Sequence, residues 1–261
     1  MESGYRDLYA EYILKGKGSD ITINFPQPII IPTQTHEGKV GLKNLVLYNN
    51  IPNVTENKNN KLRIKVPTQA EYITFSLDTG AYELSMINEQ IQEFIQVKYP
   101  ALKDVEKNFK LIGNDATSRC EFLFKADYGV DFNVEHSLNK LLGFEKTDKH
   151  LGRGRFIASH GAKIVKVTSL IVNCNILESN YINSQQVPFI YNTTINVPSG
   201  YRLMREINNI AYKRLTTSQI SSIRVWLVDQ DNESVDLRDD DLLVTLSLRL
   251  IPLVPTVELR K

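Results

Sequence analysis

Histidine is the side chain best suited to acid–base and metal chemistry near neutral pH, and this chain of 261 residues contains four. No two stand at the i, i+4 spacing of a helical zinc site, and none has Asp or Glu two residues later. Ser159 precedes His160, but an adjacent dipeptide in a loop does not place a base behind a nucleophile. We therefore expect all four to be surface or loop residues: His36, His136, His150 and His160.

The densest group of carboxylates is a set of seven between Asp229 and Asp241. Its first part, D-x-D-x-E, is typical of calcium loops, since hard cations need several oxygen ligands close together. However, Ser234 stands where such a loop needs glycine, and Asp240 where it needs a bidentate glutamate. We interpret the segment as a solvated turn between two strands, with a calcium site between subunits as the alternative.

Motifs for nucleotide or acyl chemistry are missing from the sequence. Gly16-Lys17-Gly18 lacks the third glycine of a dinucleotide fingerprint, and residues 152–155 (GRGR) match neither phosphate-binding pattern. No G-x-S-x-G nucleophile elbow occurs. We expect no catalytic residue, no cofactor and no bound metal, and hence a protein that is not an enzyme.

The composition is that of an ordinary globular protein, with 42% hydrophobic residues, 23% charged residues and a formal net charge of +1. This balance argues against a strongly basic nucleic-acid binder. No apolar run approaches the ~18 residues of a membrane helix, and residues 1–18 lack the apolar centre of a signal peptide. Cys120 and Cys174 are expected to be buried free thiols of a chain that is not secreted or inserted into a membrane. Three N-x-S/T triplets, beginning at Asn53, Asn192 and Asn232, are expected to be chance matches.

Long alternating or wholly apolar segments dominate the chain and predict strands. The last third holds four of them, separated by polar turn clusters, and shorter ones precede it. About eight main strands in two facing sheets predict an all-β sandwich. The expected strands lie within residues 20–25, 40–48, 62–66, 72–77, 109–112, 120–125, 164–177, 187–204, 220–229 and 242–251.

Two segments have helical patterns instead. Residues 85–97 carry Ile87, Ile91 and Phe94 at helical spacing, with Ser85 as a candidate cap. Residues 134–142 form a shorter predicted helix that Gly143 ends. The polar loop 145–161 is the best candidate boundary if the chain has two domains; otherwise we expect one jelly-roll domain over residues 19–250.

Both ends of the chain are candidates for contacts with neighbours. Residues 1–18 are predicted to be an N-terminal arm whose tyrosines order against another subunit, because tyrosine suits interfaces. Residues 251–261 are predicted to be a C-terminal tail. The stretch 140–166 is rich in lysine and arginine, which indicates a solvated loop or a surface that meets a polyanion. The candidate interface residues are Tyr5, Tyr9, Tyr12, Tyr181, Tyr191, Arg153 and Arg155.

Several segments together carry a family pattern. Leu138-x-x-Leu141-Leu142-Gly143-Phe144 precedes the strand segment 167–177, which is followed by residues 179–183 and 196–201. Asp229-Gln230-Asp231 forms the turn of the last strand pair, and residues 77–82 precede the first helix. The pattern covers roughly residues 70–250 and resembles the minor capsid (penton-type) proteins of Polinton/Maverick elements and adintovirus-like double-stranded DNA viruses. It departs from them at Asn232 and at Arg238-Asp239, where glycine and an arginine–glycine pair are expected.

The resemblance implies a single jelly roll whose copies form a homopentamer at each icosahedral vertex of a virion. It implies contacts with a neighbouring major capsid protein and a non-specific contact with packaged DNA. Synthesis in the host cytoplasm, with assembly there or in the nucleus, also follows from it. Three alternatives stay open: a carbohydrate- or ligand-binding β-sandwich module, a major-capsid tile, and an enzyme on a double-stranded β-helix.

Overall fold

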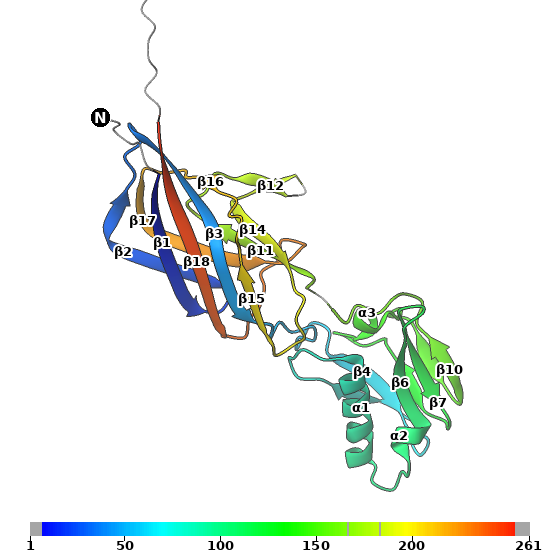
Figure 1. The fold of residues 1–261 in the computed structure, drawn as a ribbon. Coiled ribbons are helices and arrows are strands. Elements are labelled where there is room, and N and C mark those ends of the chain that lie inside the picture. The colour runs from blue at the N-terminus through cyan, green and yellow to red at the C-terminus, as the bar shows by residue number, and fades with distance from the viewer. Residues whose placement is uncertain (1–6, 166, 183, 254–261) are drawn as a thin grey trace, which may run out of the picture. The chain divides into compact units, whose positions relative to one another are not determined.

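The computed structural model describes residues 7–165, 167–182 and 184–253, without the side chain of Ile182. The chain divides into two compact units (Figure 1). Unit 1 comprises residues 1–51 and 167–261, and unit 2 comprises residues 52–166. The expected single domain over 19–250 is therefore replaced by two units, and neither boundary falls in the loop 145–161. The reason is that each unit has its own hydrophobic core, which an alternating strand pattern does not reveal.

The first sheet of unit 1 has the strand order β1–β18–β3–β15, all antiparallel. Its strands are β1 (Leu8–Lys17), β18 (Asp241–Pro252), β3 (His36–Tyr48) and β15 (Arg202–Glu206), and the short β16 (Lys213–Arg214) also pairs with β3. Figure 1 shows β1, β18 and β3 side by side in one layer.

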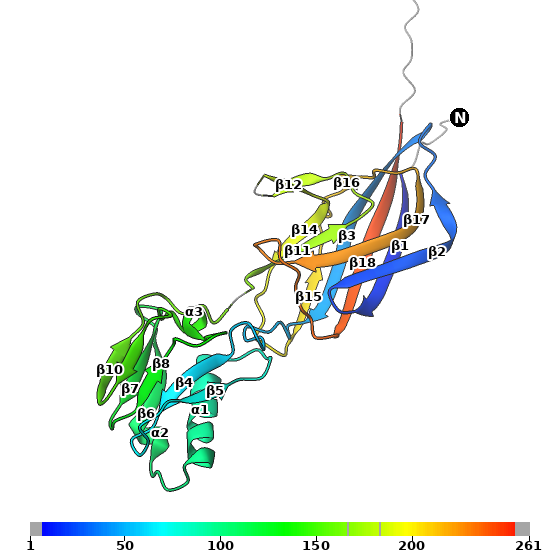
Figure 2. The same ribbon diagram turned by 180° about the vertical axis from the view of Figure 1, so that it is seen from behind.

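The second sheet of unit 1 has the order β14–β11–β17–β2, again antiparallel. Its strands are β14 (Phe189–Thr194), β11 (Ser169–Cys174), β17 (Gln219–Val228) and β2 (Asp20–Ile30). A small hairpin of β12 (Asn180–Ile182) and β13 (Gln185–Val187) is formed between β11 and β14 along the chain. Figure 2 shows β17 and β2 in the layer behind the first sheet of Figure 1.

The order of these eight strands is that of a jelly roll. Numbered along the chain, the first sheet contains strands one, eight, three and six, and the second contains five, four, seven and two. This interleaving of two Greek keys defines the jelly roll and confirms the predicted fold class. Unit 2 is inserted between the third strand, β3, and the fourth, β11.

The core of unit 1 lies between its two sheets. In β18 every second residue is buried: Leu242, Val244, Leu246 and Leu248. The facing sheet contributes Ile223, Val225 and Leu227 from β17. Alternate side chains of both strands therefore form one apolar layer, as the period of a strand requires.

Residues 8–17 are not a separate arm. They form β1, which pairs with β18 from Leu8 opposite Leu250 to Lys17 opposite Asp241. Leu14 is buried in the core, and Gly16 packs so closely that a Cβ there would lie 2.4 Å from the Ile21 side chain. The predicted arm thus belongs to the sandwich, because its period-two pattern supplies an edge strand.

Unit 2 contains two further antiparallel sheets, β5–β4–β8–β9 and β10–β7–β6. Three helices complete it, and ten aromatic or histidine rings within it pack in close pairs. The elements are β4 (Lys61–Lys65), β5 (Ile73–Ser76), α1 (Leu84–Lys98), α2 (Val105–Asn108), β6 (Phe109–Asn114), β7 (Arg119–Phe124), β8 (Gly129–Asp131), α3 (Asn139–Leu142), β9 (Lys149–Leu151) and β10 (Gly154–Ile157).

The long predicted helix is confirmed as α1, whose buried side is Ile87, Ile91 and Ile95. Its N-cap is Glu83 rather than Ser85. The second predicted helix is shortened to α3, which begins at Asn139 because His136 upstream has a φ of 59°. Gly143 ends it in the left-handed conformation, with a φ of 81°.

The buried side chain of Asn53 joins the two ends of unit 2 by hydrogen bonds. Its Nδ2 donates to the backbone oxygens of Tyr82 and Ile164, each at 2.7 Å. Its Oδ1 accepts from the Tyr82 N–H at 2.8 Å. Asn53, near the start of the unit, thereby holds Ile164, near its end.

Both departures from the family pattern lie at left-handed backbone. Asn232 has a φ of 64° and Asp239 a φ of 58°. Asn and Asp tolerate this region better than other residues with a Cβ, and glycine adopts it most readily. Both turns therefore have a backbone conformation that glycine would also adopt.

Candidate assembly interface

The outward face of the first sheet carries exposed apolar side chains. Val46 on β3 stands opposite both Leu243 on β18 and Met204 on β15. Ile13 on β1 lies on the same face, two residues from Lys15, the partner of Leu243. Ile13 is 65% exposed and Met204 is 59% exposed. We call Ile13, Met204, the exposed Tyr48, the half-buried Leu243 and Val46, which is only 8% exposed, the outer patch.

Part of the rest of this face is covered by the chain itself. A Cβ at Gly41 would lie 2.2 Å from the side chain of Ile210, so only glycine admits the segment that crosses β3 here. The Tyr212 hydroxyl is hydrogen-bonded to the Ser247 Oγ at 2.9 Å. Exposed apolar side chains gathered on one face of a sheet typically mark a contact with another molecule. The outer patch is thus the part of the sheet suited to such a contact.

The predicted interface tyrosines divide into two kinds. Tyr9 is 60% exposed, with the Arg249 guanidinium 5.6 Å from its ring centre, and Tyr181 on the β12–β13 hairpin is 72% exposed. Tyr12 packs against the core, edge-on to Phe25, and Tyr191 is partly buried against the same core. Tyr5 lies outside the described residues.

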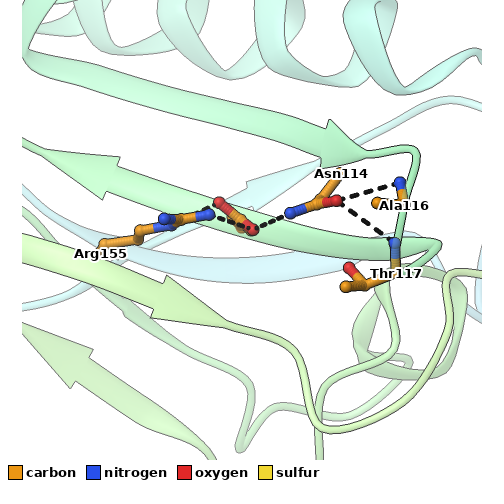
Figure 3. A network of polar contacts seen from close by, with 5 residues as sticks. Asn114, Ala116, Thr117 and Arg155 are labelled. Carbon is orange, nitrogen blue, oxygen red and sulfur yellow. Dashed lines mark hydrogen bonds and ion pairs between the residues drawn. The ribbon is translucent and has the colours of Figure 1, made fainter.

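Arg155 belongs to a polar network on the outward face of β10–β7–β6 (Figure 3). Its Nε and NH2 each donate to the Glu121 carboxylate at 2.7 Å. Asn114 donates to the same carboxylate at 3.1 Å, and its Oδ1 accepts from the backbone N–H groups of Ala116 and Thr117. The hydrogen bonds from Arg155 and then Asn114 hold the pKa of Glu121 below its usual range. The network fixes the Arg155 side chain on this surface.

The carboxylate of Asp131 is also buried, on the outward face of the sheet β5–β4–β8–β9. Asp131 pairs with Arg63 at 3.1 Å and lies 3.9 Å from Lys149. Arg153, the remaining predicted basic interface residue, donates from Nε to the Lys125 backbone oxygen at 2.8 Å. Two of the basic residues in 140–166 therefore lie beside carboxylates inside unit 2: Arg155 pairs with Glu121, and Lys149 shares Asp131 with Arg63. A polyanion surface in this region stays a prediction.

Two of the histidines have different surroundings, and the carboxylate segment that begins at Asp229 forms a turn. His160 contacts Glu145 at the surface, whereas His150 stacks on Phe156 with ring centres 4.8 Å apart, and burial lowers its pKa. The expectation of a surface position is thus wrong for His150, because its strand turns it toward the aromatic core.

Asp229 is buried, and its Oδ1 accepts the N–H groups of Asp231 and Glu233 at 2.9 and 2.8 Å. This carboxylate organises the turn itself.

Among the described residues, no three or more His, Cys, Asp or Glu side chains are grouped so that they could hold a metal ion. No helix within the same residues has the length and apolar character needed to cross a membrane.

Both cysteines are buried free thiols, as predicted. Burial raises the pKa of Cys120 to about 12 and that of Cys174 to about 11. Since only the thiolate is nucleophilic, we expect neither to react with iodoacetamide at pH 8 in the folded chain, and both to react in guanidinium. Mass spectrometry of the alkylated chain measures this, and stoichiometric labelling without denaturant would contradict it.

Among the comparisons with known proteins, the comparison with solved structures gives a match. No family model matches the chain, and no curated protein matches it. Among solved structures, the chain is similar to the mavirus penton protein in its selenomethionine-labelled crystal form. That match has 10% identity and a TM-score of 0.47 and covers 94% of this chain and 100% of that chain. At this level of similarity we take no assignment from it.

Proposed function

We propose that this chain is a structural capsid subunit of the penton type, which forms pentamers at icosahedral vertices and contacts neighbouring major capsid proteins. The observation that carries the proposal is a jelly roll whose first sheet exposes apolar side chains at both of its edges. The family pattern in the sequence supports the same assignment. The virion is then its site of action, and contact of the basic 140–166 stretch with packaged DNA is a further part of the proposal.

The distribution of the outer patch fits a closed ring. A ring of identical subunits uses a heterologous contact, in which two different surfaces of one subunit meet its two neighbours. Ile13 lies on β1, at one edge of the first sheet, and Met204 lies on β15, at the other. Each edge thus offers an exposed apolar anchor to a different neighbour. Apolar anchors of this kind supply much of the binding energy in protein interfaces.

The oligomeric state tests this proposal. We expect size-exclusion chromatography with light scattering to give a pentamer, and Ile13→Glu or Met204→Glu to shift it toward monomers, because each places a charge in an apolar contact. The matched control is Ile30→Glu, since Ile30 is 64% exposed but lies on β2 in the second sheet.

Other oligomeric states would support other functions. A trimer would favour the major-capsid tile, and a monomer that binds sugars would favour the carbohydrate module. For that module, Trp226 would be the natural stacking residue, but it is half-buried, with the Arg224 guanidinium 5.0 Å from its ring centre. A pentamer that tolerates both glutamate variants would place the contact outside the outer patch.

A further inference from the structure

We infer that a groove in unit 2, between α1 and β5, binds residues 254–261 of a second copy as an added β-strand. The inference rests on the proposed self-assembly. The groove has a volume of about 510 Å³ and an aromatic floor of Phe75 and Phe94, whose ring centres are 5.3 Å apart. Val97 on α1 forms part of its wall and is 76% exposed, the highest value among the large apolar side chains described.

Strand β5 presents an open edge to this groove. It is the terminal strand of β5–β4–β8–β9. The Leu77 N–H donates to the Asn60 oxygen, and the same register pairs Phe75 with Leu62. In an antiparallel ladder, hydrogen-bonded pairs alternate with non-hydrogen-bonded pairs. Since Leu77 and Phe75 form hydrogen-bonded pairs with β4, the backbone N–H and C=O groups of Thr74 and Ser76 point away from β4. Ser76 also lines the groove.

The same helix closes a different edge with its own side chains. Asn88 Oδ1 accepts the Leu111 N–H at 2.7 Å, and Gln92 Nε2 donates to the Phe109 oxygen at 2.7 Å. These two backbone groups belong to β6, the terminal strand of the other sheet. Proteins cover strand edges to prevent unwanted pairing. Since α1 covers β6 in this way and leaves β5 open, the β5 edge is suited to an incoming strand.

Residues 254–261 have the sequence pattern of such a strand. From Thr256 to Arg260 polar and apolar residues alternate, which places Val257 and Leu259 on one face and Glu258 on the other. Five extended residues span about 17 Å, enough to cover the four residues of β5. In β-augmentation the backbone supplies affinity, and alternate side chains fill a pocket. Val257 and Leu259 would lie over the floor formed by Phe75 and Phe94.

A labelled peptide of residues 252–261 tests the inference. The receptor is the full chain with Val257→Asp and Leu259→Asp, which leaves the groove unoccupied. We expect the peptide to bind it by fluorescence anisotropy and Val97→Glu in the receptor to weaken binding at least tenfold. The control is Met86→Glu, since Met86 is an exposed apolar residue of α1 outside the groove. Equal binding to the Val97→Glu and Met86→Glu receptors would overturn the inference.

Two measurements establish that the peptide binds as a strand. Hydrogen exchange should show new protection at the Thr74 and Ser76 amides, and protection at another sheet edge instead would refute the site. A peptide with Glu258→Pro keeps both apolar side chains but loses one backbone donor, so it should bind at least tenfold more weakly. If it binds like the parent peptide, the contact is apolar only and the added strand is disproved.

Dilution of the unmodified chain establishes that the segment comes from a second copy. Peptide binding should be blocked at high concentration and recovered at concentrations where the oligomer dissociates. A block that persists on dilution would mean that the segment binds within its own chain, contrary to the inference. A pentamer whose groove ignores the peptide would refute the inference alone. A chain that is not pentameric but binds the peptide at β5 would refute the vertex proposal alone.

Discussion

Replacement of Phe122 by alanine is expected to destabilise unit 2 by about 3–5 kcal/mol, the usual range for truncating a fully buried aromatic side chain. Phe122 on β7 is fully buried, and its ring lies 5.6 Å from those of Phe109 and Phe144 and 5.7 Å from that of Phe124. The substitution therefore removes a ring at the centre of an aromatic cluster, and the strands around it cannot close the cavity. This is the largest loss that we expect from a single truncation in the chain.

The measurement is urea unfolding followed separately for each unit by hydrogen exchange. Because the buried residues of units 1 and 2 form two separate clusters, amides of β18 and β17 should keep their protection while those of β6 and β7 lose it. Ile157→Ala is the control, since Ile157 neighbours Glu121 on the outward face of the same sheet and is 48% exposed. Parallel loss of protection in both units would show that they unfold as one.

Periodicity in the sequence predicted most individual elements of this fold. Residues 62–66 and 72–77 pair as β4 and β5, and the helical spacing of Ile87 and Ile91 corresponds to α1. Periodicity did not predict which strands share a core. The segment 120–125, with Phe122, alternates like a jelly-roll strand but belongs to the inserted unit. Which sheet a strand joins depends on contacts distant in sequence, and a local pattern does not contain them.

The candidate interface was predictable only in part. Tyr9 and Tyr12 were grouped as one surface, yet residues three apart in a strand point to opposite faces. Once residues 8–17 are recognised as β1, Tyr9 must be outward and Tyr12 inward, as the structure shows. The outer patch was missed for the same reason, because Ile13 lies within residues 1–18, which were interpreted as an arm and not as a strand. Glu121 was a lone acid in an apolar segment, and its partner, Arg155, lies 34 residues away.

Asn53 was noticed only as the start of a chance N-x-T triplet, yet its replacement by alanine is expected to destabilise unit 2 by about 2–4 kcal/mol. The change removes three hydrogen bonds of a buried side chain, including the donor to Ile164 that joins the two ends of the unit. The loss is measured by urea unfolding, followed by hydrogen exchange of the backbone amides near Ile164. Asn133→Ala is the control, because Asn133 lies in the same unit with an exposed side chain.

Asn53→Asp separates the hydrogen bonds from simple packing. Aspartate has nearly the same shape and can still accept the Tyr82 N–H, but it faces two backbone oxygens without a donor. A buried charge against two acceptors is costlier than a small cavity, so this variant should be less stable at pH 7 than Asn53→Ala. Its stability should rise as the pH falls and the carboxyl gains a proton, since the protonated form can donate again. If Asn53→Asp were as stable as the parent chain, the donation to Ile164 would contribute nothing, and the two ends of unit 2 would be held by their apolar neighbours alone.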